Sequence, residues 1–142
     1  MGIRIKITSN GGDTKNIVKI VLIDQHNRVL FLKRSEYKPK FAGEWDLPGG
    51  HIKANESLYA GLAREVSEET QLQVDNPAFI KKEDNTSYFF EKYNNQSIKI
   101  SHEHVDFKFL SESELDPKKK FDKIALEVIA RSKNGDLQQE ME

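Results

Sequence analysis

The sequence carries the stretch GHIKANESLYAGLAREVSEETQL at residues 50–72. Within it, residues 56–70 contain no proline and a single glycine, and Leu58, Leu62 and Val66 recur every four residues. Apolar side chains at this spacing fall on one side of an α-helix, where they can pack against a core. The stretch therefore predicts a helix over residues 56–70.

Asn55 precedes this helix and is expected to cap it, because its short polar side chain can accept a hydrogen bond from a backbone N–H. At about 100° per residue, Glu65, Glu68 and Glu69 share one face of the helix. Like charges at this spacing repel unless a cation lies among them, and carboxylate oxygens suit magnesium. A solvated helix face is the alternative interpretation. The apolar face is expected to comprise Tyr59, Leu62, Ala63 and Val66.

The rest of the chain predicts a β-sheet and a second helix. Apolar or alternating runs are typical of strands, and residues 24–27 join two of them as a hairpin. Residues 34–50 hold two prolines and three glycines, which predicts a loop. Pro117 is expected to open the second helix, and residues 134–142 are expected to fray. Strands are expected at residues 3–8, 17–23, 29–32, 79–82, 87–93, 97–101 and 105–110.

These elements predict one α+β domain over residues 1–142, in which a mixed sheet lies between two helices as an α/β/α sandwich. Lys plus Arg number 22 and Asp plus Glu 23, so the net charge provides no field for gripping a nucleic acid or a membrane. The chain has no cysteine, which excludes disulfides and thiolate chemistry. No apolar run approaches the roughly 20 residues of a membrane span. We therefore expect a cytoplasmic protein without a membrane or nucleic-acid partner.

The polar residues of the first helix have a characteristic spacing. The stretch 50–72 resembles the Nudix box, G-x5-E-x7-R-E-U-x-E-E-x-G-U, where U is aliphatic, and residues 45–49 resemble the usual lead-in to it. The resemblance implies an α/β/α fold and a hydrolase that cleaves a diphosphate linkage. The matching residues are Gly50, Glu56, Arg64, Glu65, Val66, Glu68, Glu69 and Leu72.

One position departs from the family pattern. Gln71 stands where the pattern has glycine, just past the predicted end of the helix. A left-handed backbone is common there and is disfavoured for a residue with a Cβ, at a cost of about 1 kcal/mol. The departure concerns the end of the helix and leaves the carboxylates in place.

The resemblance also implies a cofactor and residue roles. The cofactor would be magnesium, with manganese as a substitute. Arg64 would orient a carboxylate through a fork-like pair and is grouped with the catalytic residues, while Glu56 would brace the loop before the helix or join that pair. Gly50 and Glu56 are expected to be structural. The implied metal ligands are Gly49, Glu65, Glu68 and Glu69, and Glu65 or Glu68 could also accept the proton.

A glutamate outside the helix is a further candidate. Glu103 lies just before a predicted strand and could act as an added ligand or as the base, or could be a plain turn residue. His102 and His104 flank it, a spacing for which a polar turn is more usual than a zinc site. Arg34 could contact a substrate phosphate or form a surface salt bridge.

The box identifies the bond and not the group attached to it. Tyr88 lies sixteen residues after the box, where dinucleoside polyphosphate hydrolases often have a tyrosine, although strand packing is the alternative. Ser87 replaces the proline associated with ADP-ribose hydrolases. Phe41 could stack on a nucleobase and is grouped with Tyr88 as substrate-binding. Other aromatic residues that could stack, or simply fill the core, are Trp45, Phe89 and Phe90.

We expect a pyrophosphohydrolase acting on a small nucleotide-like substrate by attack of water at phosphorus, with a nucleoside triphosphate or a dinucleoside polyphosphate favoured. The alternative is a catalytically silent Nudix-like domain that binds nucleotide or a protein partner. Prenyl diphosphate isomerisation in a related fold normally requires a cysteine, which this chain lacks. The sequence does not determine the oligomeric state, and a homodimer is one possibility.

Overall fold

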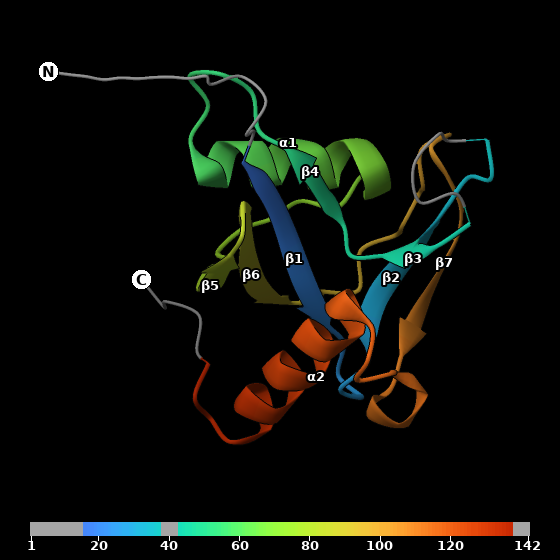
Figure 1. Cartoon of the computed structure of the whole chain (residues 1–142), viewed down its shortest axis with the longest axis vertical. Coiled ribbons are helices and arrows are strands. Elements are labelled where there is room, and N and C mark those ends of the chain that lie inside the picture. The colour runs from blue at the N-terminus through green and yellow to red at the C-terminus, as the bar shows by residue number, and fades with distance from the viewer. Residues whose placement is uncertain (1–15, 38–42, 138–142) are drawn as a thin grey trace, which may run out of the picture.

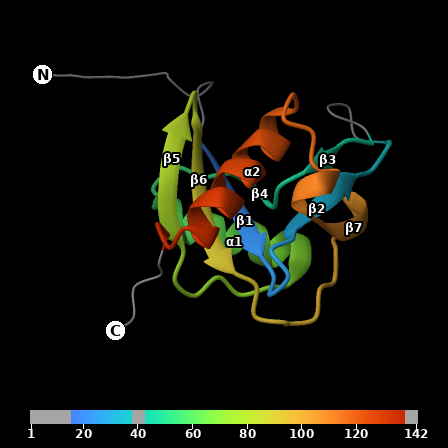
Figure 2. The same ribbon diagram turned by 90° about the horizontal axis from the view of Figure 1, so that it is seen from below.

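Two helices cover opposite faces of one sheet (Figures 1 and 2). The computed structural model describes residues 16–37 and 43–137. Helix α1 (Leu58–Thr70) lies on one face and helix α2 (Lys120–Lys133) on the other, as the predicted sandwich requires. A short 3-10 helix, η2 (Glu112–Glu114), precedes α2. The strands are β1 (Ile17–Ile23), β2 (Val29–Arg34), β3 (Trp45–Asp46), β4 (Gly49–His51), β5 (Ala78–Glu83), β6 (Thr86–Lys92) and β7 (His104–Leu110).

Strand β1 is the centre of the mixed sheet. The main strand order is β3-β2-β1-β6-β5, with β4 added beside β1 and β7 beside β2. The β1–β6 pair is parallel along the whole length of both strands, and the other pairs are antiparallel. Because β6 takes one edge of β1, β4 and β2 share the other: β4 pairs with residues 17–19 and β2 with Ile23. Residues 46–49 therefore run beside the middle of β1.

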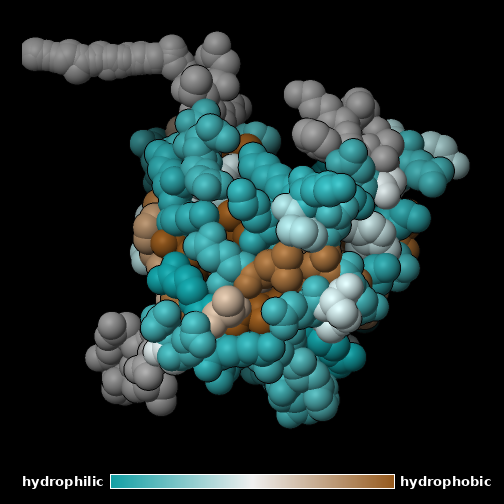
Figure 3. Space-filling model, turned by 60° about the horizontal axis from the view of Figure 1, so that its bottom comes forward, coloured by the Kyte–Doolittle hydropathy of each residue, from teal (hydrophilic) through white to brown (hydrophobic). Residues whose placement is uncertain are grey.

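The alternation of side chains along β1 supplies a core on each face of the sheet. On the α1 face, Val18, Ile20 and Leu22 join Leu62 and Val66 of the helix, all less than 5% exposed. The core on the α2 face comprises Val21, Ile23, Val29, Phe31, Leu47, Tyr88, Phe90, Leu110, Leu115, Ile124, Ala125, Val128 and Ile129. Seen from below, the molecule is mostly hydrophilic, with a short band of apolar side chains across it (Figure 3).

Helix α1 begins later than predicted. Its N-cap is Ser57, whose Oγ accepts a hydrogen bond from the backbone N–H of Ala60 at 3.0 Å. Asn55 is not the cap, because it lies two residues earlier in a left-handed turn with φ of 68°. The helix therefore starts at Leu58 and not at residue 56. Tyr59, expected on the apolar face, is 53% exposed, although its ring packs edge-on against Phe89.

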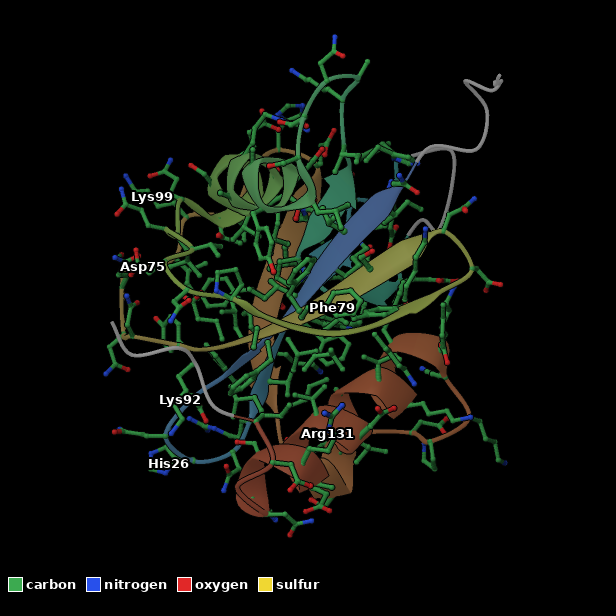
Figure 4. The ribbon with its side chains drawn as sticks, turned by 90° about the vertical axis from the view of Figure 1, so that its left-hand side faces the viewer. His26, Asp75, Phe79, Lys92, Lys99 and Arg131 are labelled. Atoms are coloured by element: carbon green, nitrogen blue, oxygen red, sulfur yellow. The ribbon has the colours of Figure 1, made fainter. Side chains whose placement is uncertain are left out.

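The predicted strand at residues 97–101 is absent from the described part of the chain. This segment runs past the end of α1 instead: the N–H of Lys99 donates to Thr70 O and that of Ser101 to Glu69 O, both at 3.0 Å. Figure 4 shows Lys99 on this stretch beside the end of α1. The apolar alternation that suggested a strand reflects Ile98 and Ile100 packing against the α1-side core.

Two other boundaries also differ. Residues 34–50 are not all loop, because the short strands β3 and β4 lie within them. Helix α2 starts at Lys120 rather than at Pro117, since Asp116 O accepts the N–H of Lys119 in a turn that precedes the helix. The predicted strand at residues 3–8 lies outside the described residues. Neither helix of the described part is long and apolar enough to cross a membrane.

Helix α1 ends at a left-handed residue that is not glycine. Gln71 has φ of 63° and ψ of 16°, and its N–H donates to Ser67 O at 2.8 Å. This is the conformation that the family's glycine adopts at no steric cost. The helix thus ends in the same left-handed conformation without a glycine, and the Cβ of Gln71 makes that conformation less stable.

We expect Gln71→Gly to raise the free energy of unfolding by about 0.5–1 kcal/mol, because it removes the steric penalty of the left-handed backbone. Urea denaturation measures the change. Ser67→Gly is the matched control, since glycine inside the exposed face of a helix should lower the stability by a similar amount. A loss of stability in both variants would show that the helix end carries no strain.

Candidate active site

Glu69 is the buried member of the carboxylates on α1. Its side chain lies at the end of the helix that faces β4, and the residue is 7% exposed. Oε1 accepts a hydrogen bond from the backbone N–H of Gly49 at 2.9 Å. Burial raises the pKa of Glu69 to about 8, against the charge of Lys19 and the Gly49 N–H, which lower it. Asp46 and Glu65 add further repulsion. The positive charge and the N–H donor near Glu69 are therefore too weak to stabilise its ionised carboxylate against burial.

Glu65 lies one turn earlier and meets the same strand. A Cβ on Gly50 would come within 2.5 Å of its carboxylate carbon, so glycine at position 50 makes the room that this side chain occupies. Burial raises the pKa of Glu65, Arg64 opposes the shift, and repulsion from Glu68 and Glu103 adds to it. Glu65 and Glu69 thus bring two carboxylates to Gly49 and Gly50 at the start of β4.

Arg64 links the helix to the loop before it. Its Nε donates to Glu56 Oε2 at 2.7 Å and Nη2 donates to Glu56 Oε1 at 3.1 Å, so the two-bond pair is with Glu56 and not with a carboxylate of α1. Nη1 donates to Glu65 Oε2 at 3.3 Å and to Glu68 Oε1 at 3.2 Å. Hydrogen bonds from Arg64 lower the pKa of Glu56 to about 2, and Glu56 also accepts the N–H of Lys53. Arg64 therefore fixes both the loop and the orientation of Glu65.

Glu68 has a different environment from its two neighbours. Its side chain is 57% exposed and lies beside Arg64, whereas Glu65 and Glu69 face Gly49 and Gly50 at the start of β4. Over residues 16–37 and 43–137, no three histidine or acidic side chains gather closely enough to hold one ion by themselves. Magnesium commonly uses one or two carboxylates and completes its shell with water and substrate phosphates. Two partly uncompensated carboxylates beside a glycine backbone fit that requirement.

The segment that runs past the end of α1 brings Glu103 near the helix. The backbone bond from Ser101 to Glu69 O fixes the segment, and the N–H of Ser35 donates to Glu103 O at 2.9 Å. Glu103 is close enough to Glu65 to raise its pKa by charge repulsion. His104 is 5% exposed and burial lowers its pKa, while His102 is exposed, so the two rings occupy different environments. Arg34 lies opposite His104 in the antiparallel pairing of β2 with β7.

The aromatic candidates are mostly core residues. Tyr88 is fully buried on the α2 face, where its ring lies 6.5 Å from that of Phe121. Burial raises the pKa of Tyr88 to about 12, against the nearby Thr86 hydroxyl, which lowers it. Phe89 and Phe90 are buried on opposite faces of the sheet. Trp45 is partly buried beneath the ammonium of Lys108, 4.4 Å from its ring, and Phe41 lies outside the described residues.

The site also contains a lysine that the sequence analysis did not single out. Lys19 lies on β1 and is 7% exposed, and its charge acts on Glu69. Its Nζ donates to Asp46 Oδ2 at 3.0 Å. The signal in the sequence was a single lysine inside the apolar strand IVKIVLI, where a buried charge requires a partner.

Comparison with known proteins assigns the family. The model of the NUDIX domain matches residues 13–131. A putative 8-oxo-dGTP diphosphatase 2 of Mycobacterium tuberculosis is 53% identical over 36 residues, which cover 25% of this chain and 26% of that protein. The chain thus spans about a quarter of the length of this curated relative. It belongs to the NUDIX family.

Solved structures agree with this assignment. The MutT protein of Methanosarcina mazei Go1 superposes with a TM-score of 0.64 at 27% identity, covering 84% of this chain and 94% of that one. An Ap4A hydrolase of C. elegans has the same fold, with a TM-score of 0.66 at 19% identity over 85% of this chain and 98% of that one. The predicted α+β Nudix fold is therefore confirmed.

The raised pKa of Glu69 has a consequence for the metal-free protein. Between about pH 5 and pH 8 the folded protein retains a proton that the unfolded chain has released, so stability falls as pH rises, by up to about 1.4 kcal/mol per pH unit. We expect urea denaturation in the presence of a chelator to show this decline, and Glu69→Gln to reduce it. A wild-type protein whose stability is constant from pH 5 to pH 8 would contradict the burial of an uncompensated Glu69.

Proposed function

We propose that this chain is a divalent-metal-dependent pyrophosphohydrolase, which cleaves a diphosphate linkage in a nucleoside diphosphate derivative by attack of water at phosphorus. The observation that carries the proposal is the meeting of Glu65 and Glu69 at the two glycines that begin β4. Both carboxylates have raised pKa values because burial leaves their charge uncompensated. Family membership and a relative named as a diphosphatase support the same reaction.

Magnesium is the cofactor we propose, with manganese as a substitute. Glu65, Glu69 and the carbonyl of Gly49 would hold it, and Glu68 could join them by leaving Arg64. All of these donors are oxygens, which suits a hard cation. When bound, the cation would lower the pKa of the attacking water and neutralise charge on the departing phosphate.

The side chains of this chain then have separate tasks. Arg64 keeps Glu65 oriented, because one guanidinium bonds both Glu65 and Glu56. Glu103 is the residue we propose to accept the proton from water. Its charge raises the pKa of Glu65, and it comes from a segment whose backbone is bonded to the end of α1. Glu65 and Glu68, the other candidates, both accept hydrogen bonds from Arg64.

For the substrate we propose a nucleoside triphosphate or a dinucleoside polyphosphate. Proteins with similar sequence or fold are named as an 8-oxo-dGTP diphosphatase and an Ap4A hydrolase, which favours these two classes. Arg34, Phe41 and Tyr88 remain the proposed substrate contacts.

Turnover with magnesium is the direct test. We expect the protein to release phosphate or pyrophosphate products from at least one member of a panel of nucleoside triphosphates, dinucleoside polyphosphates and nucleotide sugars. Glu69→Gln should abolish this turnover while the circular dichroism spectrum stays unchanged, because the variant keeps the Gly49 hydrogen bond and loses the charge. Binding of nucleotide without turnover would identify a silent domain and would contradict the proposal.

Glu103→Gln tests the proton acceptor. We expect kcat to fall by about 100-fold or more, with KM changed less than threefold, because a general base contributes about 10²–10⁴-fold. Steady-state kinetics at saturating magnesium measures both values. Glu112→Gln is the control, since this exposed glutamate lies at the far end of the molecule beside Lys133. An unchanged kcat in Glu103→Gln would assign the base to helix α1.

A further inference from the structure

A lysine is buried in the middle of the sheet. Lys19 is 7% exposed, and lysine is almost never this buried unless its charge is paired. Its Nζ donates to Asp46 Oδ2 and to the carbonyl of Leu47, both at 3.0 Å. The ammonium also lies 5.4 Å from the centre of the Phe121 ring on α2. These contacts fix the ammonium in one place.

Both acceptors of Lys19 belong to one short segment. Asp46 and Leu47 immediately precede Pro48 and Gly49. A backbone hydrogen bond from the N–H of Ile20 on β1 to Pro48 O, at 3.0 Å, joins the same segment to the strand that carries Lys19. Lys19 itself stands opposite Gly49 in the β1–β4 pair. The side chain of Lys19 therefore bonds residues 46–47 to β1, the strand with which Gly49 pairs.

The same segment is held from the other side by the helix. Glu69 accepts the N–H of Gly49, two residues beyond Leu47. Gly49 has φ of 140°, and a Cβ there would lie 2.0 Å from the carbonyl oxygen of Val18, so its backbone touches β1 closely. A displacement of residues 46–47 would therefore alter the position of Gly49 relative to Glu69.

The charge of Lys19 suggests two roles with opposite consequences. As a positive charge near Glu69, Lys19 would repel a divalent cation, so its removal should tighten metal binding. As the fastening of residues 46–47, it would keep Gly49 and Glu69 in register, and its removal should weaken metal binding. Asp46 bonds the ammonium and acts on Glu69 with the opposite sign, so it offsets part of the repulsion while the hydrogen bonds to residues 46–47 remain.

We propose that Lys19 is a positioning residue whose buried ammonium holds residues 46–49 against β1, so that the backbone of Gly49 and the carboxylate of Glu69 form one metal site. The proposal rests on the proposed function, because the ion belongs to that reaction. Within the described part of the chain, the hydrogen bonds of the Lys19 ammonium go to Asp46 and Leu47 and to none of the three carboxylates of α1. It acts through Asp46 and Leu47.

Lys19→Met tests the proposal, since methionine keeps the length and loses the charge. Binding of Mn²⁺, followed by electron paramagnetic resonance, is expected to weaken by about 10–100-fold, as for other residues that orient metal ligands. Where turnover is measurable, kcat at saturating metal should fall and KM should change less than threefold. Lys82→Met is the matched control, because Lys82 is an exposed residue of β5, and this variant should bind Mn²⁺ as the wild type does.

The sign of the effect decides the outcome. Mn²⁺ affinity in a folded Lys19→Met protein that is unchanged or tighter than the wild type would overturn the proposal. If that variant does not fold, Lys19→Gln replaces it: glutamine also lacks the charge and is too short to bond both Asp46 and Leu47, so weaker Mn²⁺ binding is again expected, with unchanged or tighter binding as the contrary result. A wild type without turnover would refute the proposed reaction, whereas the Mn²⁺ titrations would still decide the role of Lys19.

Discussion

The hydrogen bond from the Gly49 N–H to the Glu69 carboxylate joins the helix that carries the acidic residues to the sheet. It requires a close approach that only glycine permits, because a Cβ on Gly49 would lie 2.0 Å from Val18 O and one on Gly50 would meet the Glu65 carboxylate. The two glycines thus make room at the start of β4. They allow two carboxylates to lie against a strand backbone, in surroundings that favour their neutral forms.

In the proposed function, this arrangement exchanges stability for a cation site. Ionising a buried carboxylate costs free energy in the absence of a cation, and a bound cation would offset that cost. The protein confines this cost to one end of α1. Arg64 and Glu56 bond each other at the outer edge of the site, while Lys19 and Asp46 bond each other beneath it. The site is thereby enclosed by two ion pairs, neither of which uses Glu69.

The sequence predicted the fold class and the strands β1, β2, β5, β6 and β7 to within two residues, because these depend on local spacing. It failed where several residues could serve the same purpose. Asn55 and Ser57 are both good caps, and the choice fell to the one whose backbone was extended. The contact between Lys19 and Asp46, which are 27 residues apart, could not be read from spacing because it depends on how β3 and β4 fold back beside β1.

The central claim is that Glu65, Glu69 and the Gly49 backbone surround a single cation. A crystal structure of the protein soaked with Mn²⁺ and recorded at the manganese absorption edge tests it most directly. We predict an anomalous peak at about 2.1–2.3 Å from oxygens of both glutamates, close to the distance for magnesium. A peak elsewhere in the molecule, with both glutamates in the positions described above and no ion between them, would contradict the account.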